Sequence, residues 1–422
     1  MRAHVIARGT VVRARGQFVE LAMPRAALGA TVTIATLPDP TMATIYALDA
    51  EGTASAALHG DCAGLRAGTG AYLSRAALLA PLGTCALGRA VDARLRPLDA
   101  KARLDGPLVA LDARPPLPDE RATVTQPLWT GIRPIDALLT IGRGARVGIF
   151  GAPGIGKSTL LETIARGVSC DAVVVALIGE RGREAQQWLQ RIDARTTIVC
   201  ATGDRPPAER MRAADVAVAQ AGALRARGLD VLVLMDSLAR YAGAARELAV
   251  ASGESVGRAG FPPSVIGRLA LLLERFGPAY GGSTTLLATV LNDGDDRDPI
   301  SEAARSLLDG HIALSGELAA AGRYPAIDVL QSVSRTMHHA AAPSHRHAAT
   351  AVRAALESLE RTREARSLGI PCHAEGLSHA LQAEPALRRF LQQGSEPSPA
   401  AATLAALGQI ADTLGEAHGY LD

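Results

Sequence analysis

The sequence predicts an α/β fold in three parts: a small N-terminal β-barrel, a central parallel sheet covered by helices, and a C-terminal helical domain. Short alternating segments punctuated by Gly, Pro and Asp occupy residues 8–73, which is typical of a barrel built from hairpins. Apolar strands then alternate with helical stretches, a pattern that produces a parallel sheet with ligand sites at the carboxyl ends of its strands. We therefore expect domains at residues 1–73, 74–343 and 344–422.

The composition is typical of a soluble globular protein. The chain has 422 residues, of which 48% are hydrophobic, enough to bury the cores of two or three domains. Its longest apolar runs have the length of strands and fall far short of the roughly 20 residues of a membrane-spanning helix. The N-terminus lacks the apolar segment of a signal peptide. We expect a cytoplasmic protein whose membrane association is peripheral.

Charge and aromatic content argue against a nucleic-acid partner. The formal net charge is only +2 and aromatic residues make up 3% of the chain, so neither a basic patch nor a stacking platform is indicated. The cysteines have no C-x-x-C spacing, which favours reduced, mostly buried thiols over a disulfide framework or a zinc site. They are Cys62, Cys85, Cys170, Cys200 and Cys372.

Each part has its own pattern of elements. A Pro-rich stretch at residues 82–119 predicts an irregular connector that wraps the core. The strands expected in the central sheet lie at residues 172–178, 197–201, 231–235, 284–291 and 311–314. The last part is helical, with breaks at residues 369–375 and 394–399.

The strongest motif is a phosphate-binding loop between an apolar strand and a helix. The loop is Gly151-x4-Gly156-Lys157-Ser158, whose glycines let backbone N–H groups turn inward on an anion at the N-terminus of the helix. Lys157 would reach the outer phosphates of a nucleotide and Ser158 would bind Mg²⁺. Nearly all basic residues of this chain are arginines, and the only other lysine is Lys101. Lysine at position 157 therefore supports the motif, because an arginine guanidinium would not be equivalent to the compact lysine ammonium in the loop. The expected nucleotide contacts are Gly151, Ala152, Pro153, Gly154, Ile155, Gly156, Lys157, Ser158 and Thr159.

Two carboxylates follow apolar strands of the predicted sheet. The strand at residues 231–235 ends at Asp236, which would hold Mg²⁺ through its water shell, although such an Asp can also cap a helix. The strand at residues 173–178 is followed by Glu180, where a group that positions water for hydrolysis belongs. The alternative for Glu180 is a solvated charged loop.

Several further segments resemble the ATPases of type III secretion systems, which are relatives of the flagellar export ATPase and of the rotary ATP synthase catalytic subunit. The resemblance covers residues 8–393 in order, and residues 204–210 are more similar to the virulence-type exporters than to the flagellar ones. The segments that carry it are Glu180-Arg181-Gly182-Arg183-Glu184, Ala201-Thr202-Gly203-Asp204-Arg205-Pro206, Met235-Asp236-Ser237-Leu238-Ala239-Arg240, Gly260-Phe261-Pro262-Pro263-Ser264-Val265, Leu308-Asp309-Gly310-His311-Ile312, Tyr324-Pro325-Ala326-Ile327-Asp328-Val329-Leu330 and Ser332-Val333-Ser334-Arg335.

The resemblance implies a RecA-like core that hydrolyses ATP with Mg²⁺ and has its active site between subunits. By position, Glu180 matches the catalytic Glu that activates water, and Tyr324 matches the aromatic residue that stacks on adenine. Arg335 matches an arginine finger supplied by the neighbouring subunit. The remaining matches are Arg181, the partner of the catalytic Glu, Glu184, a carboxylate near the Mg²⁺ waters, and Arg240, a residue near the terminal phosphate.

The resemblance also implies partners and a place in the cell. It implies a homohexamer at the cytoplasmic face of the inner membrane. The implied partners are the central stalk and stator proteins of the export apparatus and the complexes of chaperones with secreted virulence proteins.

Three features depart from the family pattern. The chain begins close to the first barrel strand, whereas members of the family usually have an N-terminal extension that contacts the stator, so the resemblance does not extend to this contact. Gly316 stands where the family usually has an Arg, and the loop at residues 292–299 is one residue short.

Other functions stay open at this stage. A flagellar export ATPase or a rotary ATP synthase-type subunit is the main alternative, and a ring translocase on RNA is another. A nucleotide-binding subunit that does not hydrolyse ATP is disfavoured, because such subunits lack the Glu found at position 180. Four histidines, His338, His339, His345 and His347, follow the expected finger; they are either a metal site or solvated side chains of a linker.

Overall fold

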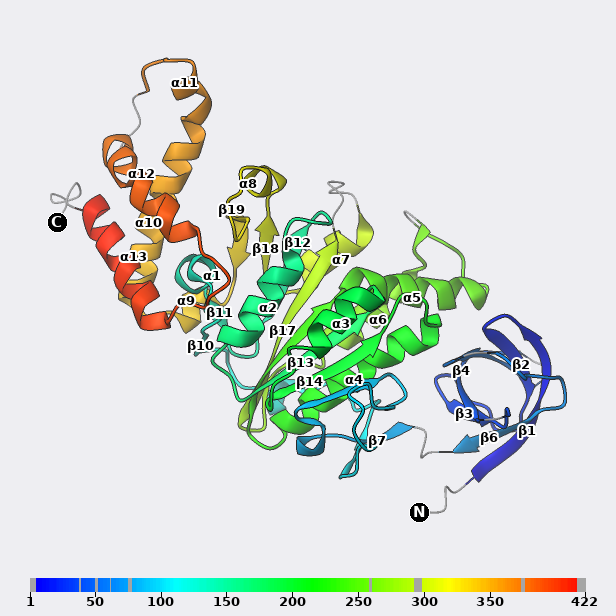
Figure 1. The fold of residues 1–422 in the computed structure, drawn as a ribbon. Helices are drawn as coiled ribbons and strands as arrows, with labels where there is room; N and C mark the ends of the chain where they lie inside the picture. Colours follow the sequence, from blue (N-terminus) through cyan, green and yellow to red (C-terminus); the bar gives the residue numbers. More distant parts are fainter. Residues whose placement is uncertain are drawn as a thin grey trace. The chain divides into compact units, whose positions relative to one another are not determined.

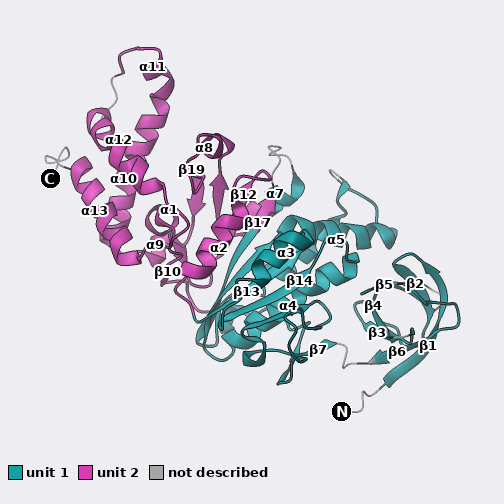
Figure 2. Cartoon of the chain, viewed as in Figure 1, with its two compact units in different colours: residues 1–121, 171–288, 297–303 teal, residues 122–170, 289–296, 304–422 magenta. Residues whose placement is uncertain are grey.

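The computed structural model describes residues 5–37, 39–49, 52–60, 62–74, 78–257, 260–291, 298–372 and 376–415. The chain divides into two compact units, coloured separately in Figure 2. Unit 1 comprises residues 1–121, 171–288 and 297–303, and unit 2 comprises residues 122–170, 289–296 and 304–422. The three-domain division stays a prediction. Most of the shortened loop at residues 292–299 lies outside the described residues, namely residues 292–297.

The N-terminal barrel of unit 1 is confirmed. Six strands close in the order β1-β2-β5-β4-β3-β6 around a core of Ala, Val, Leu and Ile side chains (Figure 1, blue). Alternate residues of each strand point inward, which is why the sequence pattern has a period of two. The strands are β1 (Val5–Arg15), β2 (Phe18–Ala22), β3 (Thr31–Ile34), β4 (Thr41–Leu48), β5 (Thr53–Leu58) and β6 (Gly70–Ser74).

The Pro-rich connector is more ordered than the sequence predicts. Its strand β9 (Leu108–Ala110) pairs with β7 (Leu79–Pro81), which lies just before the connector, and its strand β8 (Arg89–Asp92) joins the central sheet as an edge strand. Two single-turn 3₁₀ helices, Thr84–Ala86 and Pro118–Glu120, complete it. A strand of four residues is too short to show periodicity, so the sequence gives no signal for β8.

The parallel strands of unit 1 lie in the order β17-β15-β13-β14-β8. Every residue of β13 (Ala172–Ile178) and β14 (Thr196–Ala201) is buried, because helices cover both faces of a parallel sheet, and this explains the unbroken apolar sequence of β13. The other strands are β15 (Asp230–Asp236) and β17 (Gly282–Leu291), to whose edge β16 (Gly277–Ala279) adds an antiparallel pair.

Helices of unit 1 follow the strands. The longest, α4 (Pro207–Arg225), begins with a proline in its first turn, where no N–H partner is lost, and packs against β13, β14 and β15. The others are α3 (Gly182–Leu189), α5 (Leu238–Ala251) and α6 (Pro263–Leu273). Helix α7 (Pro299–Leu307) continues from unit 1 into unit 2.

Unit 2 contains the strand that leads into the phosphate loop. Strand β12 (Arg146–Gly151) pairs in parallel with β18 (Gly310–Leu314), and β19 (Ile327–Ser334) pairs antiparallel with β18. Helix α2 (Lys157–Gly167) follows the loop. The smaller elements of the unit are α1 (Arg133–Leu138), α8 (Gly316–Ala320), and the paired strands β10 (Pro127–Leu128) and β11 (Ile141–Gly142).

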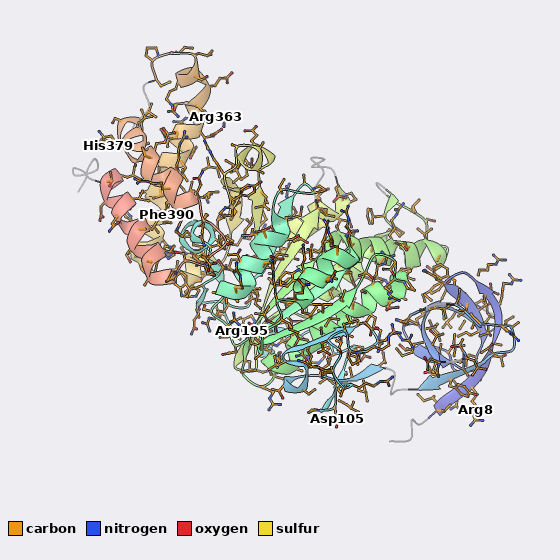
Figure 3. All side chains as sticks on the ribbon, in the orientation of Figure 1. Arg8, Asp105, Arg195, Arg363, His379 and Phe390 are labelled. Carbon is orange, nitrogen blue, oxygen red and sulfur yellow. The ribbon has the colours of Figure 1, made fainter. Side chains whose placement is uncertain are left out.

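The C-terminal helices of unit 2 pack around buried aliphatic and aromatic side chains. Val352, Leu387, Phe390 and Leu407 are all nearly inaccessible, and each such side chain contributes roughly 1.5–3 kcal/mol through burial. Figure 3 labels Phe390 among these helices. They are α9 (Met337–Ala340), α10 (Pro343–Arg361), α11 (Arg363–Ser367), α12 (Leu377–Leu391) and α13 (Ala400–Gly415). Over the described ranges, no helix is both long and apolar enough to cross a membrane.

Candidate active site

The phosphate loop of unit 2 is wound tightly by its glycines. Gly154 and Gly156 have φ angles of +82° and +95°, a left-handed conformation that side chains rarely adopt. A Cβ atom at Gly151 would lie 2.2 Å from Ile155 Cδ1, which is closer than any real contact. The sequence therefore requires glycine at these positions to bring backbone N–H groups close to an anion.

Lys157 is buried at the start of α2, with only 8% of its surface exposed. Its Nζ atom donates hydrogen bonds to the backbone oxygens of Gly151 and Ala152, both at 2.7 Å. The ammonium group thus lies over the loop, within reach of the space where phosphates would bind. Ser158 follows in the first turn of α2 and is partly exposed, so its hydroxyl is an available oxygen ligand.

A cavity of about 420 Å³ adjoins this loop within unit 2, in the size range of small-molecule sites. Gly156 lies against the Tyr324 ring, because a Cβ atom there would be 3.4 Å from Tyr324 Cε1. The Tyr324 side chain lines the cavity and is 47% exposed, so one ring face is open to a ligand. The structure therefore brings the loop and Tyr324 together, as the sequence-based assignment requires.

The sequence analysis missed one wall of this cavity. Gln393, Gly394 and Ser395 also line it, and Gln393 N donates to Tyr324 O at 2.8 Å. The Gln393 side chain is held by Arg133 N and Gly131 O at 2.9 and 2.7 Å. The only sequence signal was the predicted helix break at residues 394–399, which gives no indication of a ligand site.

In unit 1, a second cluster forms at the carboxyl ends of β13 and β15. These strands are neighbours in parallel register, with Leu177 opposite Asp236, so Glu180 and Asp236 follow the same edge of the sheet. Both carboxylates are buried, at 6% and 8% exposure. Arg240, in the first turn of α5, donates from Nε to Glu180 Oε1 at 2.9 Å.

The environment of Glu180 favours its protonated form. Burial raises the pKa of Glu180 to about 7, assisted by the negative charge of Asp236 and a hydrogen bond with Glu184, and opposed by the positive charge of Arg240. A carboxyl group with a pKa near the working pH is suited to handle protons in catalysis. The alternative, in which Glu180 belongs to a solvated loop, is inconsistent with its burial.

The structure places Glu184 near Glu180, whereas Arg181 and Arg335 are exposed. Arg181 caps α3, and Glu184 lies in the first turn of this helix, where its backbone N donates to Arg181 O at 3.0 Å. Arg335 follows β19, and its backbone N donates to Asp309 O at 3.0 Å. Arg335 does not line the 420 Å³ cavity of its own chain.

Two expectations from the sequence differ from the structure, the solvated histidines and the buried cysteines. Among the described residues no three His, Cys, Asp or Glu side chains form a group that could hold a metal ion, so the structure does not support the metal-site alternative for the four histidines. His345 is buried instead, with Nε2 2.8 Å from Ala137 O, where it stacks on Trp129. None of the five cysteines, which all lie in the described ranges, forms a disulfide, but only Cys200 is buried. Cys62 is exposed, and Cys85, Cys170 and Cys372 are partly exposed.

Comparison with known proteins places this geometry in a family. Residues 131–334 match the ATP synthase alpha/beta family, nucleotide-binding domain. A type 3 secretion system ATPase of Pseudomonas syringae pv. tomato is 44% identical over 78% of this chain and 74% of the relative. A flagellum-specific ATP synthase of Salmonella typhimurium is 43% identical over 74% of this chain and 71% of the relative. The matched region spans between 61% and 89% of the curated relatives' own length.

The fold agrees with these matches. The assembled ATPase EscN of the enteropathogenic Escherichia coli type III secretion system is similar, with a TM-score of 0.88 and 36% identity, over 96% of this chain and 100% of EscN. EscN has also been solved in complex with its central stalk EscO, for which the TM-score is 0.85. With a phosphate loop, a buried Glu180 and relatives at this level of identity and coverage, the chain belongs to the family of type III secretion system ATPases.

Proposed function

We propose that this protein hydrolyses ATP to energise protein export through a type III secretion apparatus. The observation that supports it best is the buried Glu180, which has a raised pKa beside Asp236 and is oriented by Arg240. Such a carboxylate is needed to handle water, and a subunit that only binds nucleotide has no use for it. The phosphate loop and its cavity supply the binding half of the reaction.

ATP fits the donors of unit 2. The loop offers backbone N–H groups at the N-terminus of α2, and Lys157 can turn from the oxygens of Gly151 and Ala152 to the outer phosphates. Residues 151–159 then surround the phosphates, and Tyr324 stacks on the base with its exposed ring face. Every base has a π-face, so stacking on an aromatic ring does not depend on which base is present, and it is worth about 1–3 kcal/mol per base.

Mg²⁺ fits the remaining oxygen donors. Mg²⁺ in such sites is bound by one or two protein oxygens, with substrate phosphates and water as the other ligands, so no cluster of three protein ligands is needed. We assign the Ser158 hydroxyl as a ligand, and Asp236 and Glu184 as carboxylates that hold its water shell. The ion neutralises charge that develops on the phosphates.

Glu180 orients the attacking water by accepting a hydrogen bond from it, and Arg240 keeps the Glu180 carboxylate in position. Arg181, next to Glu180 and exposed, is assigned to charge stabilisation beside it. In the proposed ring, Arg335 of a neighbouring copy supplies the finger, a group worth about 10³–10⁵ in rate in related reactions. Its exposure and its absence from the cavity of its own chain support this assignment.

We further propose a homohexamer that works at the cytoplasmic face of the inner membrane. EscN assembles and binds a central stalk, EscO, which supports a ring and a stalk partner for this protein. Chaperone release and unfolding of secreted substrates are its proposed work, and stator proteins are further proposed partners. The flagellar and rotary synthase alternatives, and an RNA translocase, are less favoured, because residues 204–210 are of the virulence type and the chain has few aromatic residues.

Paired variants test the chemistry. Lys157→Ala should abolish ATP binding, whereas Glu180→Gln should bind ATP with nearly normal affinity and lose turnover, because one residue holds phosphate and the other handles water. Binding is measured by equilibrium titration with a fluorescent ATP analogue, and turnover by phosphate release. Equal loss of binding in both variants would contradict the role of Glu180.

Secretion by living cells tests the biological role. A strain that lacks the protein should regain secretion of type III substrates with the wild-type chain and not with Glu180→Gln. The variant must be shown to be present at wild-type amounts. Normal secretion with Glu180→Gln, or a requirement for the protein in flagellar export alone, would overturn the proposal.

A further inference from the structure

A second cavity of unit 1 has no role in the chemistry above. Its volume is about 530 Å³, and it lies between the C-terminal half of α4 and the connector around β9. Its walls include the apolar side chains of Leu82, Val109 and Val218. A cavity of this size and character is suited to a small organic molecule.

The charge of this cavity is one-sided. Four arginines line it and no acidic residue does: they are Arg114, Arg225, Arg227 and Arg275. Arg114 pairs with Glu120 at 2.7 Å and Arg275 pairs with Asp215 at 3.0 Å, so two of the four arginines already have counter-ions. Arg227 is exposed at the end of α4. The positive charge that remains favours an anionic ligand.

Arg225 supplies a buried positive charge to the wall of the cavity. Only 6% of it is exposed, and its Nη1 atom donates to Arg275 O, Gly277 O and Thr284 Oγ1, all at 3.1 Å. Its Nε atom is buried and has no hydrogen-bond partner within the described residues. These acceptors are neutral, and a buried charge without a counter-ion is unfavourable. Burial lowers the pKa of Arg225, Tyr280 opposes this shift, and the nearby charges of Arg121 and Arg275 add to it.

An aromatic ring completes the site. Tyr280 lines the cavity, and the Arg225 guanidinium carbon lies 5.9 Å from the centre of its ring. The backbone of Tyr280 is left-handed, with a φ angle of +58°. The Tyr280 side chain is 53% exposed, so an accessible ring lies beside the cation. A ligand that carries both an anionic group and an apolar or aromatic body would match this wall.

We propose that this cavity binds a small organic anion, in which a carboxylate or a phosphate is attached to an apolar or aromatic body. The anionic group lies against Arg225 and Arg227, and the body lies against Tyr280 and the aliphatic wall. The site is distinct from the catalytic edge. Glu180 O accepts from Gly203 N, which precedes the N-terminus of α4, whereas the cavity lies at the C-terminal end of the same helix.

Glycine positions give matched variants for a test. Gly222 lines the cavity, and a Cβ atom there would meet no atom within 4 Å, so Gly222→Leu adds a side chain at the cavity wall where its Cβ is not in conflict with a neighbour. The control is Gly267→Leu on α6, another helical glycine with open space around its Cβ and outside this cavity. Leucine is a better helix former than glycine, so both variants should fold.

Calorimetric titrations of the full chain with benzoate, phenyl phosphate and the uncharged benzyl alcohol test the proposal. We expect at least one of the anions to bind with one site per chain, and benzyl alcohol to bind at least about tenfold more weakly, since each lost charge-assisted hydrogen bond corresponds to about tenfold in affinity. The preferred anion distinguishes a carboxylate ligand from a phosphate ligand. Gly222→Leu should abolish this binding, Arg227→Ala should weaken it by about tenfold, and Gly267→Leu should leave it unchanged.

The nucleotide site provides the counter-test. Gly222→Leu should leave ATP binding unchanged, whereas Lys157→Ala should leave binding of the preferred anion unchanged. No binding of either anion at millimolar concentration would overturn the proposal. So would equal binding of the uncharged analogue, or an affinity that does not change in Gly222→Leu and Arg227→Ala.

Discussion

Arg240 donates a hydrogen bond from Nε to Glu180 Oε1 at 2.9 Å, and this ion pair joins the first turn of α5 to the end of β13. The pair is important because burial and the charge of Arg240 shift the pKa of Glu180 in opposite directions. Burial raises the pKa of Glu180 to about 7, and the charge of Arg240 acts against this shift. Arg240 therefore lowers the pH at which Glu180 becomes a carboxylate, against the larger effect of burial.

The first prediction concerns the pH dependence of ATP hydrolysis. Because the ionised form of Glu180 accepts the hydrogen bond from water, kcat should rise with pH through an inflection near 7. Arg240→Leu removes the charge that lowers the pKa, so its inflection should lie at higher pH. Arg240→Lys keeps the charge and should move it less. Initial rates between pH 5.5 and 9 measure this, and an unchanged inflection in Arg240→Leu would contradict the coupling.

The second prediction concerns stability. A carboxyl group whose pKa is raised on folding destabilises the protein progressively as pH rises from the unfolded pKa, about 4.5, to the folded pKa, about 7. Glu180→Gln removes this effect, so at pH 8 the variant should be more stable by about 1–3 kcal/mol, a gain obtained at the expense of activity. At pH 4.5 the two proteins should be equally stable. Thermal melts without nucleotide measure the difference, and a less stable variant at pH 8 would show that the carboxylate is structural.

The third prediction concerns Tyr324. If its ring stacks on the base, Tyr324→Ala should weaken ATP binding by about 1–3 kcal/mol, whereas Tyr324→Phe should bind nearly as well, because the aromatic face is kept. The matched measurement uses inorganic triphosphate, which has no base. Its affinity should be equal in all three proteins. A similar loss for triphosphate in Tyr324→Ala would mean that the residue shapes the phosphate loop, which its ring touches at Gly156.

The fourth prediction concerns Arg335. Arg335→Ala should bind ATP normally and hydrolyse it slowly, because the finger acts on the transition state and not on the ground state. Specific activity of the wild type should rise with protein concentration as rings form.

Mixing identifies a finger that acts in trans. Rings that contain both Arg335→Ala and Glu180→Gln subunits should recover part of the activity, at interfaces that pair an intact Glu180 with an intact neighbouring Arg335. Arg361→Ala, at an exposed arginine in the last turn of α10, is a suitable control and should behave as wild type. Absence of recovery in rings shown to be mixed would refute the assignment.

The sequence predicts those parts of the fold and site that depend on local constraints. The phosphate loop requires particular glycines and a lysine at fixed spacing, so Gly151 to Ser158 can be identified without a structure. The fully buried strands, such as β13, are equally clear from their unbroken apolar residues.

Features that depend on tertiary neighbours could not be predicted in this way. The ion pair of Glu180 and Arg240 joins residues 60 positions apart, and it forms only because β13 and β15 are adjacent in the sheet. Gln393 reaches the nucleotide cavity through the fold of the C-terminal segment, and β8 joins the sheet with only four residues. No sequence period or motif specifies these contacts, even though Glu180 and Arg240 each lie in a recognisable segment.

The position of Lys157 has a consequence for which anions the loop admits. Its ammonium group is already bonded to Gly151 O and Ala152 O, so an incoming anion must replace two hydrogen bonds that are worth about 1.5–3 kcal/mol each. A lone sulfate or inorganic phosphate offers few oxygens in return, whereas a nucleotide triphosphate brings a chain of them and a base. In a cell that contains much inorganic phosphate, the two Lys157 hydrogen bonds therefore favour binding of ATP over binding of a single phosphate ion at the loop.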